Sequence, residues 1–525
     1  MHASKITSGL SRRRRTHSNA SSKSSVDGSG DVEDDTQVME AEQGNVLTHI
    51  ISQLRPGADL SRVVLPTFIL EPRSMLERIT NFMCHPEMLL SIPDMDDPVD
   101  RFVSVVKFYL SGWHIRPPGV KKPLNPILGE IFSCYWDLPD STRAYYISEQ
   151  TSHHPPKSSY FYSAPEHHIR IDGTLKPRSK FLGNSAASLM EGVAVLSLLN
   201  RGKDRKRGER YWLTQPNMYA RGILFGKMQY ELGDHSVVRC PELGLTADID
   251  FKTKGWVSGT YNAIGGTIKN ESTGATLFEL SGLWSDEMVI KDLRTGKKDM
   301  FFDARKAKPS IPSVRPLAEQ DERESQKLWE KTAKAVKERN HELATDEKTA
   351  IEDRQREEAA KRQAQNVDWH PRLFRGVRPE DGNDDGMSTL EWIINANIDG
   401  DTPQKVAQQV MAIYPIVDGQ KASGMKFAPP NGSAGNPPTA RKPAAEDNSA
   451  NLIDFNQSDA PRPAPPVPST HPSQDISTML GKTGQKTEGP LIDFTGDMKK
   501  DLPSQPGMKR SDTAESNDDF FDAQG

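Results

Sequence analysis

The sequence predicts a mainly β protein of the α+β type, built around one large antiparallel sheet. Short strand-like runs, punctuated by Gly, Asn and Asp, dominate the chain from about Pro126 to Ala304. No helical pattern separates these runs, and amphipathic helical stretches lie only before and after them. A sheet of so many short strands must curl or close, because large twisted sheets rarely stay open.

Composition divides the 525 residues into a folded segment and polar ends. Only 35% of residues are apolar, and a mean hydropathy of −0.66 is low for a chain folded throughout. Residues 1–44 are Ser-rich, then basic, then acidic, which predicts a disordered arm. Residues 421–525 hold 14 of the 38 prolines and lack Trp, Tyr and Cys, which predicts a flexible tail. We therefore place one folded domain at 45–375, followed by a linker at 376–420.

The expected helices flank the sheet. Those that precede it are Val46–Leu54, Ser74–Phe82 and Val99–Leu110. The first presents one apolar face and ends at Pro56-Gly57. About fifty residues after Pro316, rich in Glu, Lys, Arg, Ala and Gln, predict one long polar helix or two. In the linker, Ser388–Tyr414 could form two small helices around Gly400-Asp401.

The strand-like runs are separated by residues that favour turns. The expected strands are Ala144–Ile147, His168–Ile171, Val193–Leu199, Met228–Leu232, Ala247–Phe251 and Leu277–Leu283. The expected turns are Asp172-Gly173, Gly233-Asp234 and Asn270-Glu271.

Charge and cysteine content narrow the class of protein. Lys+Arg at 67 against Asp+Glu at 72 gives a net charge of −5, which argues against a nucleic-acid binder. Three cysteines, Cys84, Cys134 and Cys240, exclude a disulfide scaffold and offer no paired spacing for zinc, so no metal or cofactor is expected. No run approaches eighteen consecutive apolar residues, so no transmembrane helix is expected. We expect a cytoplasmic protein whose membrane contact is peripheral.

The first chemical motif is EQTSHHPPKSSY, Glu149 to Tyr160. His153 and His154 are followed by two prolines, which fix the backbone and remove two donors. Such a rigid pair of imidazoles could donate hydrogen bonds to a phosphate monoester. From these residues alone a structural role is favoured, since histidine occurs in many polar loops.

Two further motifs carry positive charge. VKKPLNPILGE, Val120 to Glu130, places Lys122 and Asn125 in a turn framed by prolines. DEKTAIEDRQREE, Asp346 to Glu358, spaces three charged residues at i, i+4 and i+8 on one helix stripe: Lys348, Glu352 and Arg356. Taken alone, the turn is an ordinary loop and the stripe is a solvated face with weak salt bridges. Alternatively, Glu352 holds two cations ready for a multiply charged head group.

Together the three segments resemble the oxysterol-binding protein-related family of lipid-transfer proteins, whose fingerprint is the EQ-x-SHHPP element. The NPILGE sequence also agrees, and one departure is Ser159, where the family usually has Ala. The resemblance covers about 45–375. It implies a near-complete antiparallel β-barrel around a central lipid tunnel, closed by an N-terminal lid that Val46–Leu54 fits.

The resemblance also implies binding residues. The family's phosphatidylinositol 4-phosphate site falls on Lys122, Asn125, His153, His154, Lys348, Glu352 and Arg356. The stretch Leu65 to Arg78 is most similar to short members that exchange phosphatidylserine for that phosphoinositide. By that similarity Leu65, Thr67 and Ser179 contact the second lipid, which is phosphatidylserine or a sterol.

A fourth motif ends the tail. Asp519, Phe520, Phe521, Asp522 and Ala523 resemble the two-phenylalanines-in-an-acidic-tract motif that binds VAP receptors of the endoplasmic reticulum. A second FFDA, Phe301 to Ala304, follows the strands and is expected to pack in the domain. Two LIDF copies, Leu452 to Phe455 and Leu491 to Phe494, are short linear motifs or chance repeats.

The sequence therefore predicts a carrier that exchanges phosphatidylserine, or a sterol, for phosphatidylinositol 4-phosphate at endoplasmic-reticulum contact sites. No nucleophile motif such as GxSxG and no metal constellation is present, so an enzyme is not expected. The alternative is a phosphoinositide-regulated scaffold in membrane trafficking. A scaffold would bind the lipid without accelerating its exchange between membranes.

Overall fold

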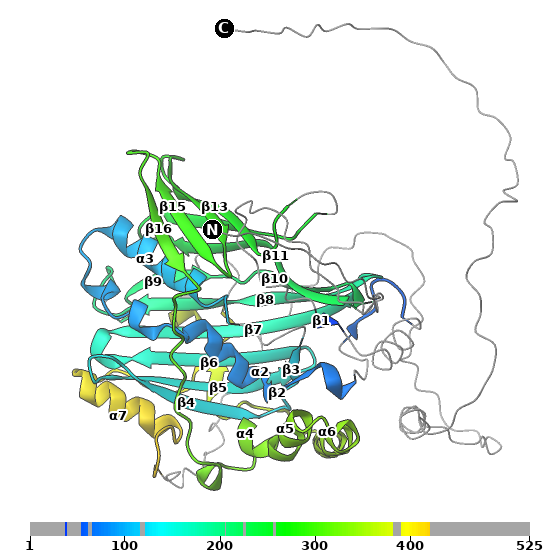
Figure 1. Ribbon diagram of the computed structural model, residues 1–525. Helices are drawn as coiled ribbons and strands as arrows, with labels where there is room; N and C mark the ends of the chain where they lie inside the picture. The colour runs from blue at the N-terminus through cyan, green and yellow to red at the C-terminus, as the bar shows by residue number, and fades with distance from the viewer. Residues whose placement is uncertain are drawn as a thin grey trace, which may run out of the picture. The chain divides into compact units, whose positions relative to one another are not determined.

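The computed structural model is centred on one sheet of fourteen strands (Figure 1). It describes residues 37–38, 54–60, 66–115, 121–204, 206–223, 227–255, 259–381 and 390–420. Along the sheet the strand order is β16-β15-β14-β13-β12-β11-β10-β8-β7-β6-β5-β4, with β9 bridging β8 and β11. Neighbouring strands are antiparallel, as expected. Among the described residues β4 and β16 end the sheet and do not pair with each other.

The elements of the fold have the following bounds. The strands of the large sheet are β1 (Gln37–Val38), β4 (Ile131–Asp137), β5 (Arg143–His153), β6 (Pro156–Ala164), β7 (Ile169–Phe181), β8 (Ser185–Leu198), β9 (Glu209–Leu213), β10 (Asn217–Arg221), β11 (Lys227–Cys240), β12 (Leu245–Lys252), β13 (Ala263–Asn270), β14 (Thr276–Leu283), β15 (Glu287–Asp292) and β16 (Lys298–Asp303). Two small sheets pair β2 (Leu70–Ser74) with β3 (Lys122–Leu124), and β17 (Phe374–Gly376) with β18 (Trp392–Ile394). The α-helices are α2 (Met75–Arg78), α3 (Pro98–Ser111), α4 (Ser325–Leu328), α5 (Glu330–Lys337), α6 (His341–Ala364) and α7 (Pro403–Ile413). The 3-10 turns are η2 (Thr67–Ile69), η3 (Ile79–Met83), η4 (Pro86–Met88), η5 (Ile92–Asp94), η6 (Pro165–His167), η8 (Leu317–Glu319) and η9 (Pro379–Asp381).

The six expected strands all fall on observed strands, but two expected turns are wrong. Asp172-Gly173 lies inside β7 and Gly233-Asp234 lies inside β11. Both glycines leave room for a neighbouring side chain and do not reverse the direction of the chain. A Cβ on Gly173 would lie 2.2 Å from the Tyr160 ring, and one on Gly233 would lie 2.8 Å from the Tyr219 ring. A glycine in a strand can therefore mark close approach of a neighbour.

Helix α3 confirms the pattern expected for Val99–Leu110. Asp97 caps it by accepting hydrogen bonds from the backbone N–H groups of Val99 and Asp100, and Pro98 occupies the first helical position. The single helix expected over Ser74–Phe82 is instead α2 followed by η3. The Thr80 hydroxyl donates to the Glu77 carbonyl, a local bond that competes with regular helix.

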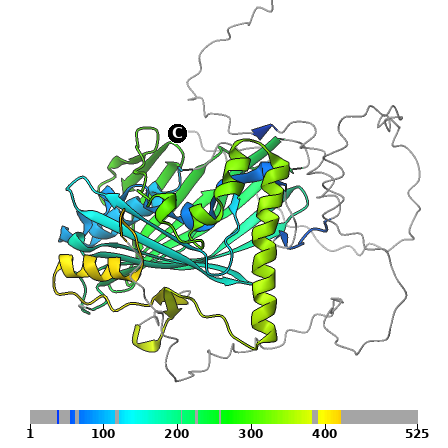
Figure 2. The same ribbon diagram turned by 90° about the horizontal axis from the view of Figure 1, so that it is seen from below.

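The segments after the sheet agree in part with expectation. The polar helix region forms α4, α5 and the long α6. Helices α6 and α7 lie on the same side of the sheet as β4, toward opposite ends of its strands (Figures 1 and 2). Of the two small helices expected over Ser388–Tyr414, the described residues 390–414 form only the second, as α7. The apolar run of the first forms β18, because Trp392, Ile393 and Ile394 pair with β17.

Most of the chain ends lies outside the described residues, as does the expected lid helix apart from Leu54. Two residues of the expected disordered arm, β1, pair with Met228 and Lys227 at the start of β11. Within the described part of the chain, every helix is too short or too polar to cross a membrane.

Strands β4, β5 and β6 are buried on both faces. On one face Trp136, Tyr146 and Tyr162 join the main core with α3. On the other face Tyr145 and Phe161 pack with residues of β17, β18 and α7. This double burial explains why β4 is mostly apolar instead of alternating, and why β6 is buried at every position from Ser158 to Ala164.

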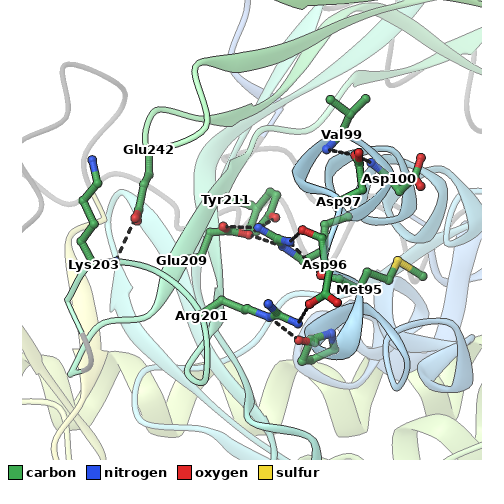
Figure 3. Close-up of polar contacts among 12 residues, drawn as sticks. Met95, Asp96, Asp97, Val99, Asp100, Arg201, Lys203, Glu209, Tyr211 and Glu242 are labelled. Carbon is green, nitrogen blue, oxygen red and sulfur yellow. Dashed lines mark hydrogen bonds and ion pairs between the residues drawn. The ribbon is translucent and has the colours of Figure 1, made fainter.

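A buried ion pair holds α3 against β9. Arg101 donates from Nε and Nη2 to the two carboxylate oxygens of Glu209, at 2.9 and 2.7 Å. The Tyr211 hydroxyl donates to the same carboxylate, and Figure 3 shows Glu209 and Tyr211 side by side. Arg101 also donates to the Met95 carbonyl. Both partners are almost fully buried, so each charge depends on the other.

Replacing Arg101→Met should lower the free energy of unfolding by about 3–5 kcal/mol, because Glu209 is left buried without its cation. Urea denaturation of the full chain measures this. The matched control is Arg143→Met, since the Arg143–Asp137 pair is exposed and is worth at most about 1 kcal/mol. Equal losses in the two variants would show that the buried pair has no special weight.

Candidate functional site

A polar cavity of about 130 Å³ lies where β3, the β5–β6 turn and α6 meet. It brings together six of the seven residues expected at the phosphoinositide site: Lys122, Asn125, His153, His154, Lys348 and Glu352. Ser179, expected at the second lipid, also lines it. Segments more than 220 positions apart in the sequence therefore form one site.

The cations of the cavity are held close together. Lys348 pairs with Glu352 one helical turn on, with 2.6 Å between Nζ and Oε1. Lys122 faces them from β3, and burial together with the charge of Lys348 lowers its pKa. The cavity thus contains two ammonium groups and only one carboxylate, an arrangement that favours an anion.

The histidine pair is oriented by a residue that the sequence analysis missed, Gln355. The backbone N–H of Leu128 donates to Gln355 Oε1 at 3.0 Å, which fixes the amide. Gln355 Nε2 then faces His153 Nε2 at 3.1 Å and must donate to it. Burial and the neighbouring His154 lower the pKa of His153 to about 4. At neutral pH His153 is therefore uncharged and carries its proton on Nδ1.

Helix geometry explains why Gln355 was missed and where Arg356 lies. An α-helix turns by about 100° per residue. Seven residues after Lys348, Gln355 returns to within about 20° of it, whereas Arg356 is rotated away by about 80°. Gln355 is accordingly 8% exposed, while the side chain of Arg356 is 62% exposed and does not line the cavity. Arg356 instead pairs with Asp353 and, at 3.8 Å, with Glu352. The single stripe expected from i, i+4 and i+8 therefore does not hold at its third position.

The last residue of NPILGE, Glu130, is a fully buried carboxylate with four donors. The hydroxyls of Ser74 and Ser325 donate to Oε1, the latter at 2.7 Å. Trp329 Nε1 and the Ile127 N–H donate to Oε2 at 2.9 and 3.0 Å. Burial raises its pKa, and these bonds favour the charged form. One side chain thus joins β2, the turn after β3 and the start of the C-terminal helices.

Two more carboxylates support the β5–β6 turn from outside. Glu149 accepts hydrogen bonds from the N–H groups of Arg372 and Leu373, although burial raises its pKa to about 7. Glu391 forms ion pairs with Lys157 on β6 and, at 2.6 Å, with Lys176 on β7. These contacts hold the segment after α6 next to the β5–β6 turn that carries His153 and His154.

An apolar pocket of about 190 Å³ adjoins the polar cavity. Four methionines and several small or aromatic side chains line it: Met75, Met190, Met218, Met228, Phe181, Ala186, Ala187 and Tyr230. Met75, Lys122, Pro123 and Ser179 line both spaces. An amphiphile could therefore place its apolar part in the pocket and its head group in the cavity.

Of the other two residues expected at the second lipid, the described one, Thr67, does not line either space. Thr67 is buried, and its hydroxyl donates to the His341 carbonyl at 3.2 Å, while the Phe68 ring contacts the His341 ring. Leu65 lies outside the described residues, and so does the tail motif Asp519 to Ala523. The internal FFDA copy is buried in and just after β16, as expected.

The fold and these two spaces define a β-sheet protein with an amphipathic binding site. The family model described as "Oxysterol-binding protein" matches residues 49–343. The oxysterol-binding protein-like protein OBPalpha of Candida albicans is 51% identical over 393 residues, 74% of this chain and 90% of the relative. Oxysterol-binding protein homolog 6 of Saccharomyces cerevisiae is 50% identical over 436 residues, 82% and 95% respectively. The chain belongs to the oxysterol-binding protein family.

Solved structures share the fold. The Osh1 ORD domain in complex with cholesterol has a TM-score of 0.55 at 21% identity, covering 71% of this chain and 98% of that one. The Osh3 ORD in complex with PI(4)P from Saccharomyces cerevisiae has a TM-score of 0.50 at 21% identity, covering 67% and 90%.

The orientation of His153 is testable by ¹⁵N NMR of the histidine rings. We expect a neutral ring protonated on Nδ1 that gains a second proton only as the pH falls toward about 4. Since an unfolded histidine protonates near 6.5, this group should make the protein lose stability as the pH falls from about 6.5 to 4. The internal control is His235, whose pKa is raised by its bond to Asp248. A His153 ring that titrates at or above 6.5 would contradict the assignment.

Proposed function

We propose that the protein is a non-vesicular lipid-transfer protein that exchanges phosphatidylserine, or a sterol, for phosphatidylinositol 4-phosphate. The observation that carries the proposal is the shared lining of the two spaces by Met75, Lys122, Pro123 and Ser179. A phosphorylated head group in the cavity and acyl chains in the pocket would satisfy both linings at once. Methionine walls suit flexible chains, because the thioether side chain adapts its shape.

The polar cavity has the donors that a phosphate monoester requires. Lys122 and Lys348 supply charge, and His153 has a proton on Nδ1 while Gln355 occupies its other nitrogen. Asn125 adds a neutral amide. Charge-assisted hydrogen bonds of this kind are worth about 1.5–3 kcal/mol each. In this proposal no bond of the lipid is made or broken, so the protein is a carrier and not an enzyme.

The solved structures support the choice of cargo. One of them holds PI(4)P and others hold cholesterol or ergosterol. Their fold supports a sheet that closes around a lipid tunnel, with the Val46–Leu54 segment as its lid. By the family resemblance, Leu65 and Thr67, which follow that segment, would contact the second lipid, as would Ser179, which lines both spaces.

Transfer between liposomes tests the function. Phosphatidylinositol 4-phosphate in the acceptor liposomes should accelerate movement of phosphatidylserine, or of a sterol, out of the donor liposomes. Two experiments, one with phosphatidylserine in the donor and one with a sterol, decide which of them is the second cargo. A phosphoinositide-regulated scaffold would bind the liposomes without accelerating either lipid.

His153→Ala with His154→Ala should reduce phosphatidylinositol 4-phosphate extraction at least tenfold, because the donors to the phosphate are lost. Extraction is measured by a fluorescent phosphoinositide probe, and circular dichroism checks the fold. The matched control is His167→Ala with His168→Ala, an adjacent pair outside the cavity lining. A folded double variant that extracts normally would refute the site.

The tail motif leads to a proposal about where in the cell the protein acts. We infer that Asp519 to Ala523 binds a VAP receptor and holds this cytoplasmic carrier at endoplasmic-reticulum contact sites. The two rings would fill pockets of the receptor, each worth roughly 1.5–3 kcal/mol on burial, and the acidic residues would speed association.

Phe520→Ala with Phe521→Ala should abolish VAP binding and disperse the protein from contact sites. Lipid transfer in vitro should not change, because the proposed exchange rests on cavity residues between Leu54 and Glu352. A pull-down with purified VAP and microscopy of tagged protein measure the two effects. Replacing Phe455→Ala and Phe494→Ala in the LIDF copies is the matched control. Capture of VAP by the Phe520/Phe521 variant would exclude this motif.

A further inference from the structure

Three metal-ligating side chains converge away from the lipid site. They come from two segments: Cys84 and His85 follow η3, and His114 lies three residues after the end of α3. Cys84 Sγ and one ring nitrogen of each histidine lie within 4.8 Å of one another. The two Nε2 atoms are 2.9 Å apart. Cys84 and His85 are buried and His114 is partly buried.

The surroundings of His85 match those of a histidine that ligates a metal. Its Nδ1 lies 3.1 Å from Glu87 Oε1, so Nδ1–H donates to the carboxylate and the Nε2 lone pair faces His114. Metal-bound histidines commonly have such a carboxylate on the other nitrogen, which fixes the tautomer. The second oxygen of Glu87 is buried and makes no hydrogen bond with the described residues.

The electrostatics of the place also favour a cation. Helix α3 ends at Ser111, and the negative end of its dipole points at the cluster. Cys84 Sγ lies 3.9 Å from the Ser111 carbonyl. The Phe302 ring contacts both imidazoles, and the Ser310 N–H donates to the Cys84 carbonyl at 2.7 Å, so the ligands are held in place.

We propose that Cys84, His85 and His114 form a site for one zinc-class divalent ion, with Glu87 supporting His85. One sulfur and two imidazole nitrogens suit zinc, which binds such sets tetrahedrally. A fourth position stays open to water. The bound ion would join the end of α3 to the segment after η3. Tetrahedral zinc bonds of about 2.0–2.3 Å place ligand atoms about 3.3–3.8 Å apart. The two imidazole nitrogens would therefore separate from 2.9 Å, and any wider spacing within the 4.8 Å cluster would close.

The test uses the full chain, freed of metal with a chelator and then titrated with Zn²⁺ against a chromophoric competitor. We expect one ion per chain, with affinity reduced at least tenfold by Cys84→Ser and by His114→Gln, and a higher melting temperature with zinc in the wild type only. Glu87→Gln should weaken binding by about 10–100-fold, the usual effect of losing a supporting carboxylate.

Two controls make the outcome decisive. Cys240→Ser removes another buried thiol, and His153→Ala with His154→Ala removes the other close pair of imidazoles, so neither should change the affinity. His114 is partly exposed, and its glutamine variant should fold even where Cys84→Ser does not. Zinc binding that is equally tight in the His114→Gln variant, or absent from the wild type, would overturn the proposal.

Discussion

The buried carboxylate of Glu130 is the constraint on which the binding site depends. Its four donors come from β2, from the turn that carries Asn125, and from the start of the helices that lead to α6. Removing a charge from water is costly unless every lone pair is satisfied, so these segments can pack in only one arrangement. That arrangement brings Lys122 to Lys348. The positive charge of the cavity therefore depends on a residue that does not line it.

The site extends beyond the part of the chain that the family model matches. That match ends at residue 343, yet Lys348, Glu352 and Gln355 follow it on α6. The described residues 372–381 and 390–394 then return to the outer face of β5–β7, where Glu149 accepts hydrogen bonds from the first stretch and Glu391 of the second pairs with Lys157 and Lys176. The hairpin with the histidine pair is thus held from inside by Gln355 and from outside by this segment. Its rigidity limits the reorganisation needed when a head group binds.

The sheet could be predicted from the sequence because its strands repeat a simple local pattern. The same local rules failed at Gly173 and Gly233, whose reason lies on neighbouring strands. Motif similarity named six residues that the structure brings to one cavity, which no local pattern could have done. Gln355 could have been predicted from the sequence, since a residue seven positions after Lys348 lies closer to the same helix face than one eight positions after it. The role of Glu130 could not have been predicted from local patterns, because its hydrogen-bond partners lie up to 199 positions away in the sequence.

The lining shared by the pocket and the cavity has a kinetic consequence. Because Met75, Lys122, Pro123 and Ser179 belong to both spaces, the two cargoes of the proposed exchanger exclude each other. In such a carrier the two lipids compete for one site. Each lipid is therefore a substrate on one membrane and a competitive inhibitor on the other. Net flux then follows the ratio of the two lipids at each surface more than the affinity for either. Tighter binding of one cargo alone would slow the cycle, since its release would become limiting.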